Sequence, residues 1–127
     1  MRWYSLQKGP PGAEAAEIGR EWSGPPIADF TPDLDDFADT AALVANLDLV
    51  IACDTAVAHL AGAMGKPVWI LNRFDGCWRW LTGRDHSPWY PSARLFTQTT
   101  ANDWPGVIDR VKAELEALAR PGVRAAP

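Results

Sequence analysis

Residues 47–71 restrict the fold most, because they predict a strand, a helix and a second strand in direct succession. Leu49–Cys53 is a short apolar run rich in β-branched residues, without polar alternation, which is typical of a parallel strand covered on both faces. Gly65 and Pro67 end the helix, and Val68–Leu71 supplies a second buried strand. The alternation of strand and helix predicts an α/β fold with a parallel sheet.

The helix between these strands is predicted to be amphipathic. Either Asp54 or Thr55 could cap its first turn with a side-chain oxygen. The apolar stripe that should lie on the sheet consists of Val57, Leu60, Ala61 and Met64. His59 falls on the opposite face with Thr55 and Gly62, so it is expected to point away from the sheet.

The junction between Cys53 and Val57 is a candidate ligand site. Ligands of open α/β sheets bind beyond the carboxyl ends of the strands, where a helix start offers unpaired N–H groups and a partial positive charge. The turn contains only small or capping residues, so a phosphate could approach its backbone, and Thr55 adds a hydroxyl. A purely structural cap explains Asp54-Thr55 equally well. For His59 alone, an ordinary hydrogen-bonded histidine is favoured, because nothing around it has metal-ligand spacing.

The composition limits the function classes. A chain of 127 residues is one domain's worth, and 47% hydrophobic and 22% charged residues are ordinary for a soluble globular protein. A net charge of -4 without a cluster of Lys and Arg argues against binding of nucleic acid. Without a long apolar run or a signal-peptide core, a cytoplasmic location and no membrane span are expected. Cys53 and Cys77 lack Cys-x-x-Cys spacing and are predicted to be reduced thiols.

The flanking residues extend the alternating pattern. Short strands are predicted at Trp3–Leu6, Ile27–Phe30 and Arg94–Thr97, and a turn is predicted at Lys8–Gly12. Three further helices are predicted. In the first, one face is expected to be shared by Ala15, Ile18, Gly19 and Trp22. The inward residues of the other two are expected to be Phe37, Thr40, Ala41 and Val44; and Trp104, Val107, Ile108, Val111, Leu115 and Leu118. Asn102-Asp103 should cap the last helix, which is expected to end at Pro121-Gly122 before a frayed tail, Val123–Pro127.

Asn72–Ser92 is a long segment without a predicted helix or strand, and such loops in compact domains tend to be functional. Its aromatic residues are Phe74, Trp78, Trp80, Trp89 and Tyr90, and they stand among Arg73, Arg79, Arg84 and His86. Aromatic planes beside arginine can stack on a base or a sugar ring. A lid of packed hydrophobic side chains is the alternative with equal physical support.

Taken together, these residues resemble a known family. The matching motifs cover residues 36–43, 47–51, 54–69, 78–81, 87–91 and 94–96, with Ser5–Pro10 as a further match. The helix start Asp54-Thr55-x-x-x-His59 is specific in combination with Trp78-Arg79-Trp80. Over about residues 3–118, the chain is similar to the carboxyl-terminal part of bacterial heptosyltransferase-like glycosyltransferases, especially those that follow tetratricopeptide repeats.

The resemblance implies a GT-B glycosyltransferase, in which two Rossmann-like domains face each other and the carboxyl-terminal one binds the nucleotide-sugar donor. It implies no metal and no other cofactor. The residues that it places at the donor are Asp54, Thr55, Ala56 and His59 in the diphosphate turn, with Gln7 and Lys8 at the end of a neighbouring strand. Because an ionised carboxylate repels a diphosphate, Asp54 is expected to cap and orient the turn, and backbone amides and Lys8 to meet the charge.

Two departures from the family pattern matter. Cys77 stands where the relatives usually carry an acidic residue. The chain also opens at what corresponds to the family's second strand, so the first strand, which lies between the second and the fourth, and the acceptor domain are missing. Residues 1–120 are therefore expected to form an incomplete Rossmann-like donor-binding domain. Trp3–Leu6 should pair with Leu49–Cys53 only if this gap has closed; otherwise self-association or a partner chain is expected, because an open edge invites pairing.

The first hypothesis is that the chain is the donor-binding portion of a glycosyltransferase that transfers a sugar from a nucleotide-sugar to an acceptor. Alone it is expected to be inactive, because the general base and the acceptor site belong to the missing amino-terminal domain. The alternative is a non-catalytic flavodoxin-like binding or signalling module, favoured by an aspartate, Asp54, at the end of a central strand. A dehydrogenase is less favoured, because no G-x-G-x-x-G follows the first strand.

Overall fold

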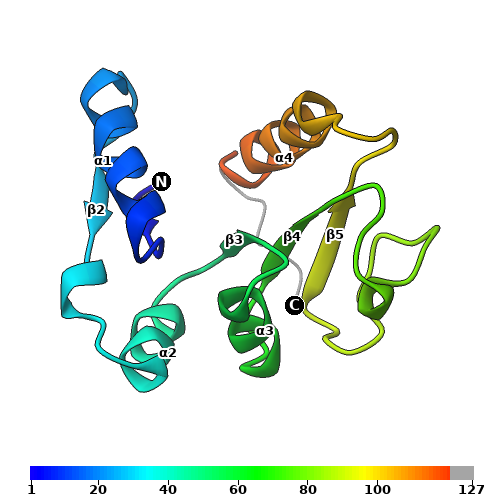
Figure 1. The fold of residues 1–127 in the computed structure, drawn as a ribbon, viewed down its shortest axis with the longest axis horizontal. Helices are drawn as coiled ribbons and strands as arrows, with labels where there is room; N and C mark the ends of the chain where they lie inside the picture. The colour runs from blue at the N-terminus through cyan, green and yellow to red at the C-terminus, as the bar shows by residue number, and fades with distance from the viewer. Residues whose placement is uncertain (121–127) are drawn as a thin grey trace. The chain divides into compact units, whose positions relative to one another are not determined.

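The computed structural model describes residues 1–120, except for the side chains of residues 13, 15, 16 and 19, and the chain divides between Leu43 and Val44 into two compact units. Strands and helices alternate along the chain (Figure 1). The named strands pair only in parallel, which confirms the predicted α/β fold class. They form a two-stranded and a three-stranded sheet rather than one continuous sheet.

The first unit contains two parallel strands, β1 (Trp3–Ser5) and β2 (Ile27–Asp29), connected by α1 (Pro10–Glu21). The predicted turn at Lys8–Gly12 is too long, because α1 already begins at Pro10. Proline is well tolerated in the first helical turn, where its missing N–H has no partner to lose. Gly9 supplies the positive φ of 77° that leads into the helix.

The apolar residues Ile18 and Trp22, which were predicted to share one face of α1, are 62% and 47% exposed. Two strands of three residues each offer little apolar surface to a helix of 12 residues. The Trp22 indole N–H instead donates to the Pro25 carbonyl just beyond the helix. The side chains at positions 15 and 19, which were predicted to share this face, are not among those that the structure describes.

A short 3-10 helix, η1 (Thr31–Asp33), and α2 (Phe37–Ala45) follow β2. Two aspartates cap the start of α2 reciprocally, since Asp36 accepts from the backbone N–H of Asp39 and Asp39 accepts from that of Asp36. Of the predicted inward residues, Thr40 and Val44 are buried and Ala41 is half-buried, whereas Phe37, in the first turn, is 61% exposed.

The second unit is built on a sheet in the order β3 (Val50–Cys53), β4 (Val68–Asn72) and β5 (Ala93–Thr97). Here α3 (Ala56–Ala63) packs on β3 and β4, and α4 (Trp104–Leu118) packs on β5. Figure 1 shows α3 and α4 on opposite sides of this sheet. The predicted arrangement of helices on both faces is therefore present in the three-stranded sheet.

Alternate side chains of β4 enter two different cores. Trp69 packs with Phe96 of β5 against Val107 and Val111 of α4. Val68 and Ile70 are fully buried on the opposite face, because successive side chains of a strand point to opposite sides. Burial on both faces explains why the central strands lack polar alternation.

The amphipathic pattern of α4 is confirmed only in part. Of the predicted inward residues, Val107 and Val111 are buried and Leu115 and Leu118 half-buried, whereas Trp104 and Ile108 are 37% and 48% exposed at the edge of the stripe. Asp103 caps the helix as predicted, because its Oδ1 accepts from the Gly106 N–H at 3.0 Å. The predicted helix end at Pro121-Gly122 and the tail Val123–Pro127 lie outside the described residues.

Within the first unit β1 pairs with β2, and within the second unit β3 pairs with β4. None of the helices within residues 1–120 combines the length and the apolar character needed to cross a membrane.

Candidate functional site

The candidate site lies in the turn that leads from β3 into α3. Cys53 ends the strand and Thr55 is the N-cap residue of α3, which begins at Ala56. The Thr55 side chain makes no capping bond, and its hydroxyl lies 3.4 Å from the Cys53 carbonyl oxygen, to which it donates. Within residues 1–120, the N-cap side chain therefore leaves the first N–H groups of this helix uncapped. Such a helix start attracts an anion.

The expectation that Asp54 caps α3 is wrong, because its carboxylate contacts His59 instead. Asp54 Oδ1 lies 3.3 Å from Nε2 of His59, and both side chains are partly exposed. On the other side of the ring, Nδ1 lies 3.0 Å from the hydroxyl of Tyr90. Both ring nitrogens of His59 are thus engaged within the protein.

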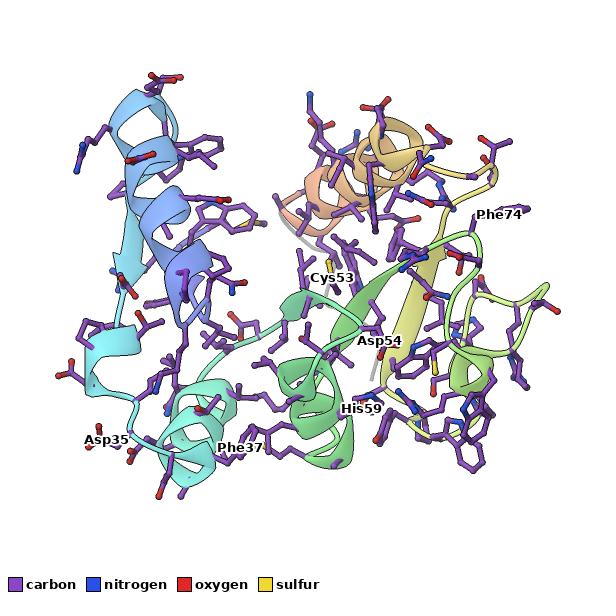
Figure 2. All side chains as sticks on the ribbon, in the orientation of Figure 1. Asp35, Phe37, Cys53, Asp54, His59 and Phe74 are labelled. Atoms are coloured by element: carbon purple, nitrogen blue, oxygen red, sulfur yellow. The ribbon has the colours of Figure 1, made fainter. Side chains whose placement is uncertain are left out.

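Aromatic rings hold His59 from the side of the loop that connects β4 to β5. Its imidazole stacks on Trp80, with ring centroids 5.1 Å apart and an angle of 20° between the planes. Trp80 is fully buried, and the Tyr90 ring meets the imidazole edge-on. Figure 2 shows His59 projecting from α3 toward this loop and Asp54 in the turn before the helix.

The buried face of α3 differs from the predicted stripe. Ala58, Ala61 and Gly62 are buried, whereas Met64 is 37% exposed. The Tyr90 ring occupies the space beside Gly62, where a Cβ atom would lie 2.6 Å from Tyr90 Cγ. The face that was expected to point away from the sheet is therefore covered by the loop. Gly62 permits this, because it leaves room for the Tyr90 ring.

The aromatic loop was expected either to stack on a ligand or to form a packed lid, and the structure divides its tryptophans between these two alternatives. Trp80, in the 3-10 helix η2 (Trp78–Trp80), is fully buried and confirms the packed lid. Trp78 and Trp89 are 71% and 58% exposed, and the Trp89 indole N–H donates to the Arg79 carbonyl at 2.8 Å. Stacking of these two exposed rings on a ligand remains a prediction.

A pocket of about 410 Å³ opens beside the turn, at the carboxyl ends of β3 and β4. Its lining consists of Cys53, Asp54, Leu71, Asn72, Arg73, Asp75, Gly76, Cys77 and Trp104. Arg73 is already paired with Asp75 through two hydrogen bonds of 3.0 and 2.7 Å. Neither cysteine forms a disulfide, as predicted. Asp54 is the lining residue that also contacts His59.

Several residues of this neighbourhood were not predicted as site residues. Asn72 ends β4 and Arg73 follows it, and their position at the carboxyl end of a parallel strand is a sequence signal that would have found them. Tyr90 is 31 residues from His59, and no local pattern connects the two. Within residues 1–120, no group of three or more His, Cys, Asp and Glu side chains could hold a metal ion.

Gln7 and Lys8 follow β1 and belong to the first unit. The Gln7 side-chain amide donates to the Lys8 carbonyl at 3.3 Å, and the Lys8 ammonium donates to the Leu34 carbonyl. Both residues are exposed. An ammonium has three donors, so the contact with Leu34 leaves Lys8 able to bind a further acceptor. Their predicted role in donor binding remains a prediction.

Comparisons with known proteins give the following matches. Residues 11–71 match the model of glycosyltransferase family 9 (heptosyltransferase). The chain is 38% identical to Protein FlbA of Caulobacter vibrioides over 104 residues, which are 81% of this chain and 16% of FlbA. The chain therefore spans about a sixth of the length of this curated relative. No solved structure matches the chain.

Proposed function

Because residues 11–71 match glycosyltransferase family 9 and confirm the predicted resemblance, we propose that this chain is the donor-binding portion of a glycosyltransferase. The proposed reaction transfers a sugar from a nucleotide-sugar to an acceptor. The observation that carries the proposal is the start of α3: it lies within the family match, at the carboxyl end of a parallel strand, and its N-cap side chain makes no capping bond.

The proposed ligand of this turn is the diphosphate of the donor. The backbone N–H groups of Ala56 and Val57 and the hydroxyl of Thr55 supply donors, and the helix dipole adds attraction for negative charge. The Asp54 carboxylate would repel a phosphate, so we assign it to hydroxyl groups of the ligand that enter the adjacent pocket. His59 takes part through Asp54. Binding at this site needs no metal.

A GT-B arrangement, in which a second domain supplies the acceptor site and the general base, remains part of the proposal. It agrees with a match that spans only 16% of the relative's length. A base must come within about 2.6–3.2 Å of the hydroxyl that it deprotonates, or act through one water. The carboxylate of Asp54 is held by His59 and faces the pocket. A second domain that fixes an acceptor beside the donor can lower the activation barrier of sugar transfer by roughly 7–11 kcal/mol.

The purified chain is therefore expected to bind a donor and to transfer no sugar by itself. Nucleotide-sugars and an acceptor panel would be supplied with and without a candidate amino-terminal partner, and activity only on complementation would support the proposal. Robust transfer by the chain alone would refute the proposal that a second domain supplies the acceptor site and the general base. A tetratricopeptide neighbour, a cytoplasmic location and self-association through an open strand edge remain predictions.

The direct test of ligand class is a calorimetric titration with ADP, GDP, UDP and CDP, with inorganic phosphate as the control. Saturable binding of at least one nucleoside diphosphate, much tighter than that of phosphate, is expected. Phosphorylation of Asp54 by a small phosphodonor, without nucleotide binding, would instead favour the flavodoxin-like signalling module. Absence of binding by every nucleotide would refute the proposed function.

A further inference from the structure

The contacts of His59 form a chain of three side chains that the sequence did not predict. The hydroxyl of Tyr90, on the loop before β5, meets Nδ1 at 3.0 Å, and Nε2 meets the carboxylate of Asp54 at 3.3 Å. We infer that Tyr90 is a positioning residue, whose hydroxyl orients His59 so that His59 holds the Asp54 carboxylate at the wall of the pocket. The consequence for ligand binding rests on the proposed function, but the chain of contacts does not.

The chemistry of the three groups determines where the proton of His59 lies. An ionised carboxylate only accepts, so its 3.3 Å contact with a neutral His59 is attractive only if Nε2 carries the proton. Nδ1 then has only a lone pair, which needs a donor, and the phenol of Tyr90 is that donor. Tyr90 therefore selects the tautomer that Asp54 requires. Without the phenol, Nδ1 would lose its partner inside the protein.

Tyr90 is itself held firmly enough to act in this way. Its backbone N–H donates to the hydroxyl of Ser87, which is buried, and its carbonyl accepts from the N–H of Ala93 at the start of β5. Its ring packs against Gly62 of α3. The phenol is thus presented to His59 by a fixed loop.

Trp80 closes the remaining side of the imidazole. Its ring stacks on His59 with centroids 5.1 Å apart, so the imidazole cannot rotate freely about its Cβ–Cγ bond. One hydrogen bond to Tyr90, the 3.3 Å contact with Asp54 and one stacked ring then fix the plane of His59. This fixed plane determines where its Nε2–H points and hence where the carboxylate of Asp54, which also lines the pocket, lies.

The test combines ¹⁵N NMR of the histidine rings with nucleotide titration. The chain has two histidines, so His86 serves as the internal reference, and its other tyrosine, Tyr4, supplies Tyr4→Phe as the matched control for Tyr90→Phe. At a pH above which the ¹⁵N resonances of both rings no longer change, His59 of the unaltered chain should carry its proton on Nε2. Tyr90→Phe should shift the Nδ1 resonance of His59 and leave His86 unchanged, and Tyr4→Phe should move neither.

The same variants separate positioning from folding. Tyr90→Phe removes one oxygen atom and should keep the unfolding transition cooperative, while weakening binding of the best nucleoside diphosphate about three- to tenfold. A proton on Nδ1 of His59, or a ring spectrum that Tyr90→Phe does not alter, would overturn the inference. If the spectrum changes as expected but no nucleotide binds even the unaltered chain, the proposed function fails and the positioning of His59 by Tyr90 stands.

Discussion

The ring of Tyr90 lies so close to α3 that a Cβ atom at Gly62 would stand 2.6 Å from its Cγ and 2.7 Å from a second ring carbon. Real Cβ atoms do not approach neighbours so closely, so the loop can cover this face of α3 only because residue 62 is glycine. This one contact fixes the position of the phenol that reaches His59.

Replacing Gly62 by alanine should destabilise the second unit by about 1–3 kcal/mol, because the added methyl group overpacks the contact with Tyr90. In a Tyr90→Ala background the clash is absent, and the same change should stabilise the helix by up to about 1 kcal/mol. Denaturant unfolding of the four chains of this cycle measures the difference. Equal effects of Gly62→Ala in both backgrounds would contradict the contact.

The cap of α4 predicts a second stability change. Asp103→Ala removes the acceptor of the Gly106 N–H and should cost about 0.5–2 kcal/mol. Asp103→Asn keeps a side-chain oxygen and should cost less, and Asp109→Ala, on the exposed part of the same helix, serves as the control. Thermal unfolding monitored by circular dichroism reports all three. A loss for Asp109→Ala as large as that for Asp103→Ala would refute the cap.

The ion pair between β5 and α4 predicts a pH dependence. Arg94 donates to Glu114 at 2.9 Å, and this hydrogen bond lowers the pKa of Glu114 below its ordinary value of 4.5. A lowered pKa stabilises the folded chain above about pH 4.5, and the contribution is lost as the pH falls through the folded-state value. Since the two side chains are 37% and 41% exposed, it should amount to at most about 1 kcal/mol.

Glu114→Gln should remove this part of the acid-side loss of stability, whereas Glu116→Gln, an exposed neighbour on the same helix, should leave it in place. Urea unfolding between about pH 3 and pH 6 measures it. Identical pH profiles of the unaltered chain and Glu114→Gln would show that the pair does not contribute.

Lys8 gives a prediction for ligand binding. If its ammonium binds a phosphate oxygen, Lys8→Ala should weaken binding of a nucleoside diphosphate by about 1.5–3 kcal/mol. Lys66→Ala is the matched control, because the Lys66 ammonium likewise donates to a backbone carbonyl, that of Ala45. Calorimetry should show a loss of affinity for Lys8→Ala alone. Equal affinity of Lys8→Ala and the unaltered chain would exclude Lys8 as a ligand.

The sequence predicts the strands and helices of the second unit well, because buried parallel strands and capped helices leave strong local patterns. Leu49–Cys53 and Val68–Leu71 differ from β3 and β4 by one residue each. The exposure of Ile18 and Trp22 was not predictable, because periodicity shows that a helix has an apolar face but does not show whether a surface exists to cover it.

For the site, the sequence identifies the turn but not its contacts. Asp54 and Thr55 are both good capping residues, and only the position of His59 decides that the Asp54 carboxylate contacts the imidazole instead. The partner of His59 lies in an irregular loop, where no periodicity indicates which aromatic ring turns inward. Trp78 and Trp80 are two residues apart, yet the first is 71% exposed and the second is fully buried.

The most direct measurement is a ¹⁵N-resolved NMR titration with the nucleoside diphosphate that binds best. The start of α4 is the internal comparison, because it lies in the same unit and is capped by the Asp103 side chain. If the uncapped start of α3 binds the diphosphate, the amide resonances of Thr55, Ala56 and Val57 should shift most, and those around Gly106 should hardly move. Larger shifts around Gly106, or none in residues 55–57 under saturating nucleotide, would contradict the assignment of this turn as the donor site.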